Sequence, residues 1–278
     1  TASLLLPAIW IGFAVQNPQT PYIVMLILAL LCGFGGGNFA SSMANISFFY
    51  PQSKKGAALG MNAGLGNLGV STVQFLVPLV ITVGLFGALG GEPQTLVKDG
   101  VSSQVWLQNA GFIWVPFILM VTAAAWFGMN DIASAKASFS DQAIIFKRKH
   151  NWLMCWLYIG TFGSFIGFSA AFAMLIKAQF PEVEDPVRFA FLGPLVGALT
   201  RPLGGWMADQ LGGARVTMVN FMVMTLAVIG VLIFLPDEAG SGNFVGFLAM
   251  FLLLFATTGI GNGSTFLMIP AIFRTEHE

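Results

Sequence analysis

Charged residues are scarce in this chain of 278 residues. Lys and Arg number 12, Asp and Glu also number 12, and together they make up 9% of the sequence, against about a quarter in an ordinary soluble domain. So few charges cannot cover a soluble surface. A net charge of zero also gives no basic stripe for nucleic acid, so no nucleic-acid partner is expected. A hydrophobic content of 56% and a mean hydropathy of +0.80 predict a membrane protein that crosses the bilayer several times.

Cysteine and histidine are rare too, with two of each. Cys32 and Cys155 lie in apolar stretches, so the sequence has neither a disulfide framework nor the spacing of a metal site. It also lacks the His-Glu-x-x-His and Gly-x-Ser-x-Gly patterns and any pair of Asp residues inside an apolar run. An intramembrane hydrolase needs such a set. We therefore expect no enzyme activity, no metal and no cofactor.

Long apolar runs dominate what remains, separated by short segments rich in Pro, Gly and charge. A helix needs about 20 apolar residues to cross the hydrocarbon core, and in lipid its backbone groups must pair within the segment. We expect about eight helices, at residues 1–16, 22–49, 57–89, 106–128, 152–176, 188–208, 215–235 and 243–273. The first run starts at Thr1 without a basic leader, so we expect an internal fragment of a longer protein.

Basic residues are distributed unevenly between the loops. One alternating set of loops contains eight Lys and Arg residues and the other contains three, which predicts that the first set is cytoplasmic. An even number of spans then places both ends of the chain in the cytoplasm. The polar segment 130–151 is the longest cytoplasmic loop, and we expect it to join a first bundle, residues 1–129, to a second bundle, residues 152–278.

Arg201 is the one charged residue deep inside an apolar run. On insertion scales an Arg at mid-membrane costs about 2.5–3.5 kcal/mol, and such residues usually face a water-filled cavity. A snorkelling side chain that reaches the lipid headgroups is the alternative. A guanidinium offers planar, two-pronged donors that match planar oxyanions. No carboxylate or His lies inside a run, which favours carriage or exchange of an anion over proton coupling.

Small residues recur in the third run. Gly56, Gly60 and Gly64 are four residues apart, so they lie on one helix face that permits close approach of another helix or leaves room for a ligand. A weak internal repeat is also visible. Phe49 follows the pair Gly37-Asn38, and Phe273 follows the pair Gly261-Asn262 at the same spacing. Such a repeat is typical of duplicated transporter halves.

These blocks together resemble a known family. The segments 37–51 and 58–70, the segments 161–170 and 261–266, and the loop 209–215 are similar to the nitrate/nitrite porter family of the major facilitator superfamily, in its bacterial NarK-type branch. The chain departs from the first nitrate signature at Ala63, where relatives have Gly. The resemblance implies an all-α transmembrane fold that is part of the superfamily fold, with the eight runs corresponding to helices 3–10 of twelve.

The resemblance also implies a binding site. In this family the anion lies between two arginines, on helices 2 and 8; Arg201 matches the second, and helix 2 falls outside this chain. It further implies hydrogen bonds from Asn67 and Tyr158, flanking rings from Phe39 and Phe162, signature glycines Gly60, Gly64, Gly66 and Gly69, and a cytoplasmic loop motif with Asp209, Gly213 and Arg215.

The resemblance predicts a carrier of nitrate and nitrite in a bacterial cytoplasmic membrane, working by alternating access as a monomer in the lipid bilayer. Exchange of nitrate for nitrite is expected because uncompensated arginines in an empty carrier penalise its return without an anion. Two alternatives remain open, a proton-coupled nitrate symporter and an anion-sensing membrane protein that does not transport.

Overall fold

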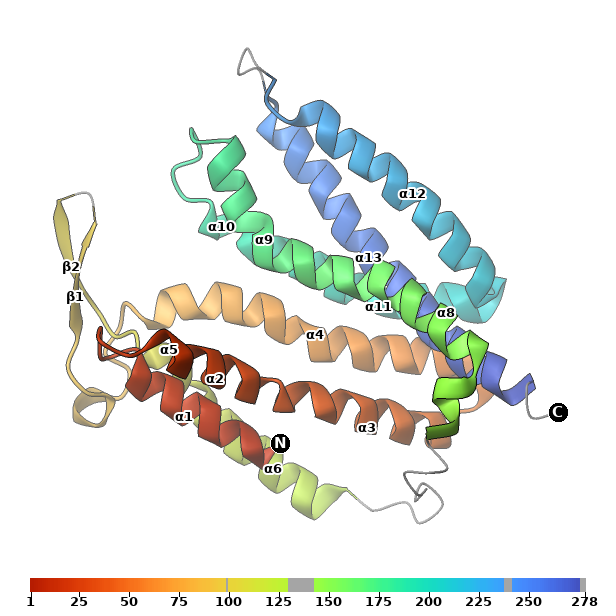
Figure 1. Ribbon diagram of the computed structural model, residues 1–278, viewed down its shortest axis with the longest axis horizontal. Coiled ribbons are helices and arrows are strands. Elements are labelled where there is room, and N and C mark those ends of the chain that lie inside the picture. Colours follow the sequence, from red (N-terminus) through yellow and green to blue (C-terminus); the bar gives the residue numbers. More distant parts are fainter. Residues whose placement is uncertain (99, 130–142, 238–241, 276–278) are drawn as a thin grey trace. The chain divides into compact units, whose positions relative to one another are not determined.

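The computed structural model describes residues 1–98, 100–129, 143–237 and 242–275 (Figure 1). Every one of the eight predicted runs contains a helix, and the all-α transmembrane class is confirmed. Six helical segments of the described chain are long and apolar enough to cross a membrane: Tyr22–Phe49, Lys55–Val80, Asn109–Gly128, Lys149–Gln179, Gly213–Phe234 and Phe244–Ile272.

The two other predicted runs are helical but differ in character. The first contains α1 (Leu5–Ala14), which has only 10 residues. The sixth contains the short α10 (Val187–Ala190) and the 20-residue α11 (Leu192–Leu211). Helix α11 is long enough to span, but Arg201, two prolines and four glycines lower its hydropathy. The least apolar of the long helices is thus the one that carries the buried charge.

The chain forms two compact units. The first comprises Thr1–Ser41 and Phe75–Ala133, and the second comprises Ser42–Gln74 and Ser134–Glu278. The expected division into bundles 1–129 and 152–278 stays a prediction. Most of the expected inter-bundle loop, residues 130–142, lies outside the described residues.

In the first unit, α1 packs against α2 (Tyr22–Cys32), α5 (Asn109–Phe112) and α6 (Trp114–Gly128). The ring of Phe112 covers Gly12, and its centroid lies 5.2 Å from that of Phe13. A methyl group at Gly111 would lie 2.5 Å from the carbonyl oxygen of Ala8. Small residues therefore bring α1 and α5 into backbone contact.

Helix α4 (Lys55–Val80) ends nine residues before the end of the predicted run 57–89, so the predicted C-terminal boundary was wrong. The fully buried amide of Asn109 donates to the carbonyl oxygens of Val80, at 2.9 Å, and Val83, at 2.7 Å. These bonds satisfy carbonyls that a helix end leaves free. Apolar composition alone could not reveal this stop because its partner lies far along the sequence.

The following polar stretch contains a hairpin that the sequence analysis missed. Strands β1 (Gln94–Lys98) and β2 (Val101–Val105) pair antiparallel, with Gln94 opposite Val105 and Lys98 opposite Val101. Gly100 has φ of +79°, which suits glycine. The dipeptide Asp99-Gly100 is a strong hairpin signal and could have predicted this turn.

The boundary between the units falls inside α3 (Phe34–Phe49), and the second unit contains its part from Ser42 onward. The second unit also contains most of α4, together with α8 (Lys149–Tyr158), α9 (Ser164–Gln179), α10, α11, α12 (Gly213–Phe234) and α13 (Phe244–Thr275). Helix α13 packs against both α11 and α12 (Figure 1). Aromatic rings fill the core between α9 and α13, and Phe172 and Phe251 stack at 4.6 Å between centroids. These Phe residues are packing residues.

Candidate anion-binding site

Arg201 lies at the middle of α11 and is fully buried. Its backbone is enclosed by two other helices: a methyl group at Gly60 of α4 would lie 2.7 Å from the Arg201 carbonyl oxygen, and one at Gly263 of α13 would collide with the same atom. The glycines on α4 and α13 therefore let three backbones converge at the arginine. The snorkelling alternative is wrong, because a snorkelling guanidinium would be exposed.

The guanidinium of Arg201 makes one hydrogen bond to protein. Its Nη1 donates to the carbonyl oxygen of Ala63 on α4, at 3.1 Å. Its Nε and Nη2 are buried and have no hydrogen-bond partner among the described atoms. These two nitrogens share one edge of the guanidinium, the edge that offers two parallel N–H groups to a planar oxyanion. The described part of the chain thus satisfies one side of the cation and supplies no partner to the forked side.

Two phenylalanine rings flank this cation. The guanidinium carbon lies 4.4 Å from the ring centroid of Phe165 and 5.3 Å from that of Phe162. Ring faces attract cations through their quadrupole, more strongly where water is excluded. The two rings stack at 6.1 Å with 15° between planes, so they form a flat wall beside a flat cation.

A single π-helical turn, Ile159–Gly163, precedes Phe165 and contains Phe162. Such turns insert one residue into a helix and are frequent at functional sites. The turn joins α8 to α9 and follows directly after Tyr158, whose ring stacks on Phe162 at 5.0 Å. It therefore sets the direction in which the tyrosine and the two phenylalanine rings point.

Tyr158 lies near both Arg201 and Asn262. Asn262, on α13, is fully buried, and neither its Nδ2 nor its Oδ1 has a hydrogen-bond partner of ordinary geometry among the described atoms. A buried amide without partners costs roughly 1–3 kcal/mol. A polar ligand beside Arg201 is a chemically suitable partner for it.

Asn67 shares a hydrogen-bond acceptor with Arg201. Its Nδ2 donates to the carbonyl oxygen of Ala63 at 2.8 Å, the same oxygen that Arg201 contacts. The structure thus brings together Arg201, Asn67, Tyr158 and Phe162, four residues that were expected to form the site. Phe39 lies on α3 in the first unit and is half-buried. The binding roles of all five stay predictions.

The four signature glycines divide into two pairs. Gly60 and Gly64 face α11, where an added methyl group would lie 2.7 Å from the carbonyl oxygens of Arg201 and Ala198. Gly66 and Gly69 have open space around them. The first pair thus serves close helix packing at the arginine, and any part in gating stays a prediction.

The loop motif lies at the ends of α11 and α12. Asp209 accepts hydrogen bonds from the backbone N–H groups of Gly56, at 3.0 Å, and Ala57, at 2.8 Å, in the first turn of α4. A carboxylate at a helix N-terminus is stabilised by the helix dipole. Gly213 packs against Ser264 and Met268 of α13, while Arg215 is exposed.

The sequence analysis did not predict Asn262 and Phe165 as site residues. Phe165 was one of many Phe residues, and sequence offers no way to choose among them. Asn262 had a signal, because it belongs to the Gly-Asn pair of the internal repeat. Its significance depends on burial without a partner, which only the structure reveals.

Comparisons with known proteins show which proteins this chain is similar to. No family model matches the chain. It is 55% identical to the nitrate/nitrite transporter NarU of Escherichia coli, over 99% of this chain and 58% of that protein. It is 54% identical to NarU of Salmonella typhimurium, over 99% of this chain and 58% of that protein.

A third relative is the probable nitrate/nitrite antiporter NarK2 of Thermus thermophilus, which is 47% identical over 98% of this chain and 62% of that protein. The chain therefore spans about three fifths of the length of the curated relatives it matches. These matches run along nearly all of the sequence, so the chain is similar over its whole length to bacterial nitrate/nitrite transporters.

Proposed function

We propose that the protein transports nitrate and nitrite across a membrane by alternating access, exchanging one anion for the other, with Arg201 as a ligand of the anion. The observation that carries this proposal is the buried guanidinium of Arg201, whose Nε and Nη2 have no hydrogen-bond partner among the described atoms. The names of the relatives, nitrate/nitrite transporter and nitrate/nitrite antiporter, support the choice of anion.

The shape of the free edge favours these two anions. Nitrate is planar and nitrite is bent, and both present two oxygens on one side. Two parallel N–H groups match such an edge with charge-assisted hydrogen bonds. The Phe162 and Phe165 rings beside the guanidinium favour a flat anion over a tetrahedral one. One site can therefore accept either substrate.

The burial of the charge favours exchange over one-way carriage. An unpaired ionised side chain without water is costly, and bound anion neutralises it. A carrier that must reorient would do so more readily with an anion bound. The return of the empty carrier is then slow, and an internal anion is needed for each turnover.

The test is the substitution Arg201→Lys in the complete protein, reconstituted into vesicles loaded with nitrite. Lysine retains the charge and loses the two-pronged edge. Hydrogen bonds to a charged group are worth about 1.5–3 kcal/mol, so we expect nitrate uptake at low concentration to fall roughly tenfold or more. Arg188→Lys, at an exposed arginine of α10, is the matched control. Undiminished exchange in the Arg201 variant would contradict the site.

The same vesicles separate the alternatives. Uptake that needs internal nitrite and survives a protonophore supports exchange. Uptake without an internal anion that collapses with a protonophore would favour proton symport. Nitrate binding without flux would favour an anion sensor.

We also propose a monomeric carrier in a bacterial cytoplasmic membrane with both ends of the chain on the cytoplasmic side. The excess of Lys and Arg in one set of loops supports the cytoplasmic position of both ends. Labelling of single cysteines introduced in alternate loops of intact cells, and the mass of the purified protein in detergent, test these points.

A further inference from the structure

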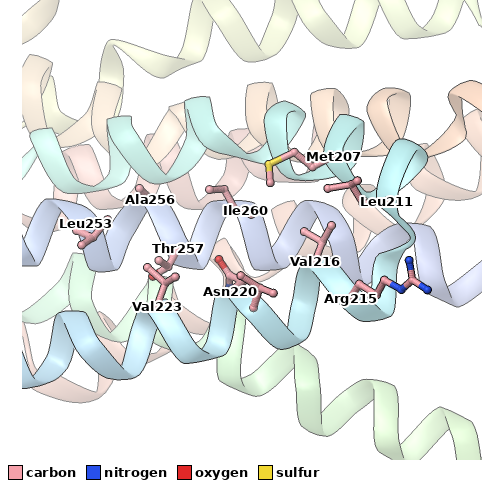
Figure 2. A pocket seen from close by; sticks show the side chains of 11 residues that line it. Met207, Leu211, Arg215, Val216, Asn220, Val223, Leu253, Ala256, Thr257 and Ile260 are labelled. Atoms are coloured by element: carbon pink, nitrogen blue, oxygen red, sulfur yellow. The ribbon is translucent and has the colours of Figure 1, made fainter.

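A groove runs along the second unit between α11, α12 and α13, separate from the surroundings of Arg201 (Figure 2). Its volume is about 330 Å³. The smallest pockets that bind small molecules have volumes of roughly 300 Å³. Its walls are almost entirely apolar and include Met207, Leu211, Val219, Val223, Leu253 and Ile260. A narrow apolar groove of this kind suits a slender hydrocarbon chain.

One end of this groove carries a cation. Arg215 lies in the first turn of α12, directly after the loop that contains Gly212 with φ of +88°. Its side chain is exposed and extends beyond the apolar row (Figure 2). The nearest acidic residue in the sequence, Asp209, accepts hydrogen bonds from Gly56 and Ala57. The charge of Arg215 is therefore available to an anion at the mouth of the groove.

A polar group lies deeper in the same wall. Asn220 is 5% exposed, and its Nδ2 has no hydrogen-bond partner among the described atoms. It follows Arg215 by five residues of α12, which is about 7.5 Å of helix rise. In a glycerophospholipid the ester carbonyls lie one glycerol unit deeper than the phosphate. The Asn220 Nδ2 lies against Gly261 of α13, and rotation of the amide would turn this donor toward the groove at that depth.

We propose that this groove binds one anionic glycerophospholipid, with the phosphate on Arg215 and an acyl chain along the apolar wall. The order of groups decides the occupant: a cation at one end, an amide below it and hydrocarbon beyond. Arg215 belongs to the loops predicted to be cytoplasmic, and the cytoplasmic leaflet is the one rich in anionic lipid. The site is independent of the anion carried at Arg201.

The experiment uses the complete protein, purified and delipidated in detergent. Phosphatidylglycerol or phosphatidylcholine is added, and bound lipid is counted by native mass spectrometry while thermal unfolding is followed in parallel. We expect phosphatidylglycerol to bind and stabilise, and Arg215→Gln to weaken its apparent affinity about fivefold, as expected for one basic residue at an anionic surface. Val219→Phe, at a half-exposed position of the groove, should obstruct the acyl chain.

Lys149→Gln is the control, because it removes one exposed positive charge outside the groove, on the same predicted side of the membrane. It should leave phosphatidylglycerol binding unchanged, and unfolding without lipid shows that each variant is folded. Equal binding of phosphatidylcholine, equal stabilisation by a free fatty acid, or undiminished binding in both groove variants would each overturn the proposal.

Discussion

Arg201 and Asn262 are both fully buried, and each has polar atoms that the described part of the fold does not pair. Asn109, also fully buried, uses its amide nitrogen to donate twice to backbone carbonyls and has only its Oδ1 without a partner. Thr217 and Ser264 pair with each other at 2.8 Å. Since unpaired buried groups reduce stability, the proposed anion would supply partners for Arg201 and Asn262.

Replacing Asn262 with Leu tests that explanation. Leucine has nearly the same size and removes two unpaired polar atoms, so we expect the thermal stability of the anion-free protein to stay the same or rise. If the amide binds the anion, the concentration of nitrate that half-saturates exchange should increase roughly tenfold, because one hydrogen bond to a charged group is lost. Thermal unfolding and vesicle exchange give the two measurements.

Asn109→Leu provides the contrast, because its amide stabilises the end of α4. That variant should lose stability while the half-saturating nitrate concentration stays unchanged. A fall in stability of Asn262→Leu with unchanged exchange would show that Asn262 is a structural residue.

At the scale of elements, the site depends on how closely α4, α11 and α13 approach. The four-residue spacing of Gly56, Gly60 and Gly64 predicted a face for close contact, and the structure pairs that face with α11. The sequence could not name the partner helix, since any neighbour with small residues would fit. It also could not separate these glycines from Gly66 and Gly69, which face open space.

The contrast between those glycines gives a second prediction. In Gly60→Ala the new methyl group would lie 2.7 Å from the Arg201 carbonyl oxygen, so α4 and α11 must separate, at a cost of about 1–3 kcal/mol. In Gly66→Ala nothing lies within 4 Å, and the gain in helix propensity is about 1 kcal/mol at most. We expect a lower unfolding temperature in the first variant only. Equal unfolding temperatures would contradict the packing of α4 against α11.

Two local features at this scale escaped the sequence analysis. The π-helical turn Ile159–Gly163 has no compositional mark, because it depends on how α8 and α9 pack against α13. The hairpin of β1 and β2 did have a mark, the dipeptide Asp99-Gly100. This signal is local and lies between two long apolar runs, whose composition does not predict a strand.

At the scale of the whole molecule, binding of the anion should increase the thermal stability of the folded protein. A ligand that binds only the folded state at about 100 times its dissociation constant adds about 2.7 kcal/mol. We expect nitrate and nitrite, but not sulfate, to raise the unfolding temperature of the complete protein in detergent. Sulfate is tetrahedral and does not match a flat edge beside the rings of Phe162 and Phe165.

The variant Arg201→Lys should lose most of this stabilisation, and Arg188→Lys should retain it. Stabilisation by nitrate that persists in the Arg201 variant would place the anion elsewhere. This measurement does not require transport, so it also applies if the protein is a sensor.

The sequence by itself determined the membrane class and the approximate positions of the helices, because the solvation of apolar runs and of charge depends on local composition. It also identified Arg201, since a single charge in an apolar run is visible without a fold. Only the tertiary structure decided which atoms of Arg201 are paired, which rings flank it and that Asn262 is buried beside Tyr158. Those facts depend on residues far apart along the chain, whose contacts arise from packing between helices and leave little trace in local sequence.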